Sequence, residues 1–156
     1  MIILSKLADY GVIVAAELAA DPGRQVTAGQ LAASTRLPQA TVAKVLKALA
    51  HAGIVTGARG AAGGYRLAKG AEAISVASVV AAIDGAIGIT QCTTHPVSGA
   101  THTCERTHFC PTRPHWQRIN LAVSTALSAV TLADMVADRL PFLARPARPS
   151  GDRAAP

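Results

Sequence analysis

The chain has 156 residues, a formal net charge of +6 and an apolar fraction of 50%, yet only 3% of its residues are aromatic. This length suits one ordinary domain, or a small domain with a dimerisation arm, and the composition favours a helical core filled by alanine, valine and leucine. No stretch reaches the roughly 18–20 apolar residues that cross a bilayer, so we expect a cytoplasmic protein without a membrane partner.

The first fifty residues predict three helices. Ser5 can cap a helix that runs to about residue 20, and Thr27 opens a short second helix with capping-box spacing to Gln30. The third helix is expected over residues 38–51, with Pro38 at its first position. One face of it is apolar at helical spacing: Val42, Val45, Leu46 and Leu49.

A β-hairpin is expected next. Short apolar runs at residues 54–56 and 65–67 flank a glycine-rich stretch that carries Arg59. Three helices and then a hairpin is the order of a winged helix-turn-helix, which places its last helix in the major groove of DNA. The wing arginine can reach the minor groove. A nucleotide-binding loop is disfavoured, because no Lys-Ser/Thr pair follows the glycines.

The second half predicts a further helix from Ser75 to about Asp84, a polar loop over residues 86–112, and a long helix over residues 113–130. A short helix restarts after Thr131. The apolar stripe of the long helix favours a dimer interface and consists of Trp116, Ile119, Val123, Leu127 and Val130.

The expected fold is therefore mainly α with a small β-hairpin wing, a winged helix-turn-helix plus a long C-terminal dimerisation helix. We divide the chain into residues 1–72, the DNA-binding domain, and residues 73–112, a linker helix with a cysteine-bearing loop. Residues 113–140 form the dimerisation helix and a short terminal helix, and residues 141–156 a disordered tail.

Charge is unevenly distributed. No acidic residue lies between Asp21 and Glu72, and an anionic partner is the expected use of such a one-signed segment. Double-stranded DNA is favoured over RNA, because Tyr65 is the only aromatic residue there for stacking on bases. The segment holds seven basic residues: Arg24, Arg36, Lys44, Lys47, Arg59, Arg66 and Lys69.

The chain has three cysteines, Cys92, Cys104 and Cys110, all within a short polar stretch. An odd, clustered set is not a complete disulfide framework, which leaves metal ligation or redox chemistry as the natural alternatives. Their wide intervals are unlike the short pairs of a zinc site, whereas an iron–sulfur cluster accepts loop-borne thiolates at irregular spacing. A zinc site, a bare thiol switch and inert buried cysteines stay open.

An enzyme is disfavoured. A metalloenzyme with histidine and cysteine ligands would need a general base, and the chain has no H-x-E or H-E-x-x-H pattern. We therefore expect no catalytic residues and no small-molecule substrate.

Several segments resemble a known family. They are Leu4-Ser-Lys-Leu-Ala-Asp-Tyr10, Leu37-Pro-Gln-Ala-Thr-Val-Ala-Lys-Val-Leu46, Arg59-Gly-Ala-Ala-Gly-Gly-Tyr-Arg-Leu67 and Trp116-Gln-Arg-Ile-Asn120. Together they are similar to the iron–sulfur-sensing winged-helix repressors, the IscR/NsrR-like family. Cys110-Pro-Thr-Arg113 and Leu132-Ala-Asp-Met135 look most like its branch of SUF-system cluster-assembly regulators.

The resemblance implies a homodimer that binds operator DNA and controls cluster-assembly genes in a bacterium. It also implies a 2Fe-2S or 4Fe-4S cluster on the three cysteines, although the interval before Cys104 is longer than the family's commoner one. Asp9 of the other subunit matches the fourth ligand of NsrR-like members. IscR-like members use a histidine after the last cysteine, where this chain has His115, while His108 and His102 precede Cys110.

On this basis we expect the third helix to enter the major groove, Arg59 to enter the minor groove, and the start of the first helix to touch phosphate. Loss or oxidation of the cluster is expected to release the operator or to change which operator is preferred. The expected DNA-binding residues are Ser5, Lys6, Thr27, Gln39, Thr41, Lys44, Lys47, Arg59, Gly60, Gly63, Gly64 and Tyr65.

Overall fold

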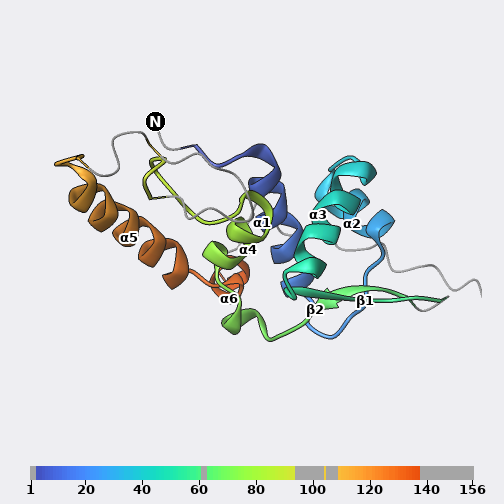
Figure 1. Ribbon diagram of the computed structural model, residues 1–156. Coiled ribbons are helices and arrows are strands. Elements are labelled where there is room, and N and C mark those ends of the chain that lie inside the picture. Colours follow the sequence, from blue (N-terminus) through green and yellow to red (C-terminus); the bar gives the residue numbers. More distant parts are fainter. Residues whose placement is uncertain (1–2, 61–62, 94–103, 105–108, 138–156) are drawn as a thin grey trace, which may run out of the picture.

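A computed structural model describes residues 3–60, 63–93, 104 and 109–137 (Figure 1). The expected tail and three of the histidines, His95, His102 and His108, lie outside these residues. The elements are α1 (Lys6–Ala19), α2 (Ala28–Thr35), α3 (Gln39–His51), β1 (Val55–Ala58), β2 (Gly64–Leu67), η1 (Ala71–Ala73), α4 (Val76–Asp84), α5 (Arg113–Ala129) and α6 (Leu132–Ala137).

The helices begin where the sequence supplies capping side chains. The hydroxyl of Ser5 accepts a hydrogen bond from the Ala8 amide at 3.0 Å. Thr27 and Gln30 form the expected capping box at the start of α2. Ser75 caps α4 in the same way as Ser5 caps α1. Each cap satisfies an amide that the first helical turn leaves without a partner.

The start of α3 differs slightly from expectation. The helix begins at Gln39, and Pro38 is its N-cap residue with ψ at 135°, not its first helical residue. The extended conformation of Pro38 follows the left-handed turn at Arg36, where φ is 58°. That turn separates α2 from α3, and Gly53, with φ at 68°, follows the end of α3 as expected.

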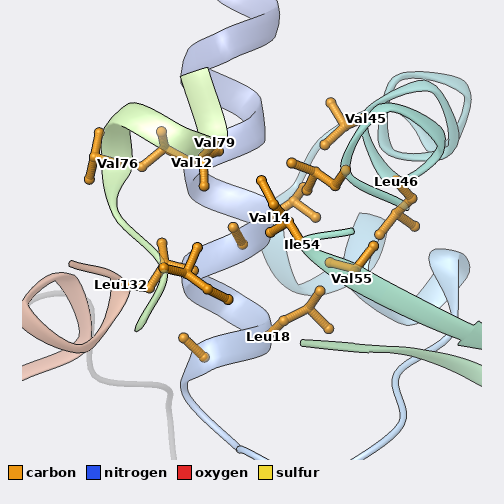
Figure 2. Packing of buried hydrophobic residues seen from close by; sticks show 14 of the residues in the cluster. Val12, Val14, Leu18, Val45, Leu46, Ile54, Val55, Val76, Val79 and Leu132 are labelled. Atoms are coloured by element: carbon orange, nitrogen blue, oxygen red, sulfur yellow. The ribbon is translucent and has the colours of Figure 1, made fainter. Parts of the chain in front are cut away.

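One apolar core is shared by α1, α3, the hairpin, α4 and α6 (Figure 2). The helix α1 lies at its centre, with α3 and the hairpin on one side and α4 and α6 on the other (Figure 2). Leu132 of α6 is completely buried in this core. Burying one such leucine stabilises the fold by about 1.5–3 kcal/mol. The division at residues 72 and 73 stays a prediction, but α4 and α6 pack on the same core as the helix-turn-helix.

The wing is an antiparallel pair of strands in which Val55 lies opposite Leu67. The segment before α2 extends this sheet, because Val26 and Tyr65 exchange two backbone hydrogen bonds of 3.0 and 2.8 Å. Gly64 allows this approach, since a Cβ atom there would lie 3.0 Å from the Val26 carbonyl. The Val26–Tyr65 bonds and the close approach at Gly64 therefore attach the wing to the segment before α2.

The long helix α5 differs from the rest because none of its residues is buried. It lies on the far side of α1 and α4 from α2, α3 and the wing (Figure 1). Trp116, Ile119 and Leu121 expose 36%, 45% and 67% of their surface. Only its last turn joins the core, through Leu127. Within the described residues, no helix combines the length and the apolar character that a membrane span requires.

Candidate nucleic-acid interface and cysteine site

The polar face of α3 is the first part of the candidate interface. The four valines and leucines predicted from the periodicity of α3 are fully buried against the core. Gln39, Lys44 and Lys47 are exposed on the other side of the helix, and Thr41 is half-buried. Ala40 and Ala43 lie among them and are also exposed, which lets the helix backbone come close to another surface.

The wing and the start of α2 form the second part. They line an open groove of about 370 Å³ that contains six of the expected DNA-binding residues. Arg59 is exposed at its rim, and Gly63 turns tightly, because a Cβ atom there would lie 2.5 Å from the Ala58 carbonyl oxygen. The groove residues are Thr27, Ala28, Gly57, Ala58, Arg59, Gly60, Gly63, Gly64 and Tyr65.

The positive charge of this surface is largely uncompensated. Arg24 forms an ion pair with Asp21 at 3.8 Å, and both side chains are partly exposed to solvent. Within the part of the chain that the structure describes, Lys44, Lys47 and Arg59 form no ion pair. Exposed cations on neighbouring elements repel one another, so an incoming anion lowers the electrostatic energy of this face.

Ser5 and Lys6 are at the start of α1, away from the wing. Both are exposed, as a phosphate contact requires. However, the Ser5 hydroxyl already donates its proton to Asp84 Oδ1 at 2.7 Å. A phosphate contact by Ser5 stays a prediction, and the neighbouring carboxylate opposes it.

The three cysteines form no disulfide, and each is half-buried. Cys92 lies in a tight turn, in which the Thr93 amide and hydroxyl both donate to the Thr90 carbonyl at 2.9 Å. The Cys92 sulfur is 3.2 Å from the Thr90 hydroxyl, and the Cys110 sulfur is 3.2 Å from the Thr112 hydroxyl. Each of these two sulfur atoms thus has a hydroxyl group as a hydrogen-bonding neighbour.

These cysteines suit an iron–sulfur cluster in their chemistry. Cysteine thiolates are the usual ligands of such a cluster, and hydrogen bonds to ligand sulfur are one way in which a protein tunes it. In the described residues of one chain, however, no three histidine, cysteine, aspartate or glutamate side chains gather to hold a metal. Asp9 is exposed on α1 and His115 is exposed on the first turn of α5. The ligand set therefore stays a prediction, and His108 lies outside the described residues.

One residue that the sequence reasoning did not select is Asn120 on α5. Its Oδ1 accepts a hydrogen bond from the Ile89 amide at 3.1 Å, and its Nδ2 donates to the Ile87 carbonyl at 3.1 Å. The segment that leads into Cys92 is thus attached to α5. Asn120 ends a motif that is part of the family resemblance, but no local pattern indicated its partner.

The sequence pattern of the Rrf2 family, described as "Iron-dependent Transcriptional regulator", matches residues 4–138. Curated relatives include the HTH-type transcriptional regulator IscR of Yersinia pseudotuberculosis. It is 33% identical over 84 residues, which are 54% of this chain and 48% of the relative. The IscR of Vibrio parahaemolyticus is 31% identical over 90 residues, 58% of this chain and 50% of the relative. These matches span about half the length of the relatives.

Solved structures share this fold over most of the chain. The structure of CymR, the global cysteine regulator of B. subtilis, has a TM-score of 0.67 and 28% identity, and the match covers 88% of this chain and 98% of that one. The structure of T. potens IscR also has a TM-score of 0.67, with 24% identity over 94% of this chain and 93% of that one. The winged helix-turn-helix expected from the sequence is confirmed.

Proposed function

The chain belongs to the Rrf2 family of transcriptional regulators, and on this premise we propose that it is a homodimeric repressor controlled by an iron–sulfur cluster. It is a DNA-binding regulator and not an enzyme. The observation that carries the DNA-binding part of the proposal is the joint exposure of Lys44, Lys47 and Arg59 on the helix-turn-helix and wing, without ion-pair partners among the described residues.

The helix α3 reads the operator in this proposal. Its amphipathic packing directs Gln39 and Thr41 to base edges in the major groove, while Lys44 and Lys47 neutralise phosphates. Arg59 reaches the minor groove from the wing. Each neutralised phosphate releases counterions, so affinity falls steeply as the salt concentration rises.

Dimerisation occurs through α5. A second copy of the chain would cover Trp116 and Ile119, which α5 exposes. If the two-fold axis of the dimer runs through the paired α5 helices, the two α3 helices lie on opposite sides of it. They could then enter successive major grooves at half-sites about 34–36 Å apart. The orientation of α5 relative to α3 therefore sets the operator spacing.

The cysteines link α5 to the signal. Cys92, Cys104 and Cys110 would hold the cluster, with Asp9 of the other subunit or His115 as the fourth ligand. When bound, the cluster supplies a redox-sensitive connection between thiolates. Cys110 lies three residues before α5, and its carbonyl accepts a hydrogen bond from the Arg113 amide at 3.3 Å. Movement of these thiolates would thus be transmitted to α5.

The proposal for the regulated genes rests on sequence motifs alone. Cys110-Pro-Thr-Arg113 and Leu132-Ala-Asp-Met135 resemble the SUF-system branch, so we propose control of cluster-assembly genes in the cytoplasm of a bacterium. Zinc binding or a thiol switch without a cluster is the second candidate. The lack of a three-donor group among the described residues of one chain favours the thiol switch, which needs no metal ligands.

DNA binding tests the proposal. We would measure fluorescence anisotropy on promoter DNA of cluster-assembly genes with anaerobically reconstituted protein and with metal-free protein. Lys44→Ala should weaken binding and lower the salt slope by about one unit. Lys69→Ala, outside the proposed contacts, is the control. If a Cys92, Cys104 and Cys110 triple alanine variant keeps the affinity and the response of the reconstituted protein, control by the cysteines is excluded.

A further inference from the structure

Asn120 is the one side chain that joins α5 to the segment before Cys92 through two hydrogen bonds to backbone, among the described residues. Its amide plane faces Ile87 and Ile89, which are two positions apart. Asn120 therefore makes one backbone hydrogen bond on each side of Gly88 and holds residues 87–89 against α5.

A carboxamide can make both bonds at once, since it carries a donor and an acceptor in one plane. The Ile89 amide requires an acceptor and the Ile87 carbonyl requires a donor, so the orientation of the Asn120 amide is set by its partners. A carboxylate accepts the first bond but opposes the second, and an aliphatic side chain makes neither. Asn120 itself is half-buried, on a helix whose other large side chains are mostly exposed.

The attachment continues from Ile89 to the sulfur atom of Cys92. Thr90 follows Ile89 directly. The Thr90 amide is held in place, because it donates a hydrogen bond to the Thr93 hydroxyl at 3.1 Å. The turn is closed by the two bonds from Thr93 to the Thr90 carbonyl. The Thr90 hydroxyl then contacts the Cys92 sulfur at 3.2 Å. The Asn120–Ile89 bond, the Thr90–Thr93 turn and the Thr90–Cys92 contact thus connect α5 to the Cys92 sulfur.

We propose that Asn120 is a positioning residue that fixes Cys92 against α5 before any metal or cluster binds. Cys110 is held next to α5 by its place in the chain and by the bond to the Arg113 amide. Two of the three thiols would then share α5 as a common support. This inference deepens the proposed function, but its structural content concerns the metal-free protein and does not require a cluster.

The test uses metal-free, reduced, full-length protein and measures alkylation of each cysteine by N-ethylmaleimide with mass spectrometry. The variants are Asn120→Leu, which loses both bonds, and Asn120→Asp, which can keep one. Gln117→Leu, an exposed amide on the same helix, is the matched control. Hydrogen exchange of the Ile89 amide is followed in parallel, because its partner is removed directly.

In Asn120→Leu, we expect Cys92 to react about tenfold faster and the Ile89 amide to exchange faster by a similar factor, while Cys110 changes by less than about twofold. The alkylation rate of Cys92 in Asn120→Asp should lie between those of Asn120→Leu and the wild type. In Gln117→Leu this rate should match that of the wild type. An unchanged Cys92 rate in Asn120→Leu overturns the proposal. Equal acceleration at Cys92 and Cys110 also overturns it, since it indicates general loosening of the fold. A colourless protein after reconstitution would oppose the cluster without affecting these rates.

Discussion

The hydroxyl of Ser5 donates a hydrogen bond to Oδ1 of Asp84 at 2.7 Å, although 79 positions separate the two residues. The hydroxyl oxygen of Ser5 also accepts a hydrogen bond from the Ala8 amide at the start of α1. Asp84 is the last residue of α4, from which the chain continues toward Cys92. The start of α1 is thus connected to the end of α4, after which the chain leads to Cys92.

Ser5→Ala should lower the free energy of unfolding by about 1 kcal/mol, because α1 loses its N-cap as well as the bond to Asp84. Urea denaturation followed by circular dichroism measures the change. Asp84→Asn is the control, since its amide oxygen can still accept the Ser5 proton. Equal stability of Ser5→Ala and the wild type would show that the cap does not contribute.

Gly64→Ala should destabilise the wing by about 1 kcal/mol or more. The φ angle of Gly64 is 155°, and the added Cβ would lie 3.0 Å from the Val26 backbone. Gly29→Ala in α2 is the control, because nothing lies within 4 Å of its Cβ position and alanine favours a helix. The midpoints of thermal unfolding should fall for the first variant and stay or rise for the second.

Asp134→Asn should lower stability near neutral pH and have no effect in strong acid. Hydrogen bonds from the Thr131 side chain and amide lower the pKa of Asp134 below its usual range. A carboxylate with a lowered pKa stabilises the fold above its unfolded pKa, and that contribution disappears as the pH falls through the folded value. Unfolding titrations should show a difference in unfolding free energy between Asp134→Asn and the wild type at pH 7. This difference should shrink toward zero below about pH 3.

Ile119→Glu should dissociate the dimer, because the charge would be buried at the proposed α5 interface. Gln117→Glu introduces the same charge at an exposed position of the same helix and is the control. Sedimentation velocity measures both. A dimer that persists unchanged in Ile119→Glu would place the interface elsewhere.

Local features were predictable from the sequence because their causes lie within one helical turn or one hairpin. Thr27 and Gln30 form the predicted capping box, and the stripe from Val42 to Leu49 is buried as expected. The hairpin was predictable from two apolar runs around glycines. These signals depend on neighbours three or four positions apart, which periodicity and capping rules describe.

The contacts between distant segments were not predictable. Asn120 meets residues 31 and 33 positions away, and nothing in the spacing of either segment indicates the other. The bridge between Val26 and Tyr65 and the burial of Leu132 likewise depend on how the elements pack. The fourth ligand is a similar case. Asp9 is expected to act across subunits, and no pattern within one chain can test that.

The iron and sulfide content of anaerobically purified protein, read with its visible spectrum, tests the central claim most directly. The account predicts a brown protein whose iron and acid-labile sulfide are both lost in the Cys92, Cys104 and Cys110 triple serine variant. A colourless wild-type protein without sulfide after anaerobic reconstitution would contradict it, and bound zinc in that protein would favour the second candidate.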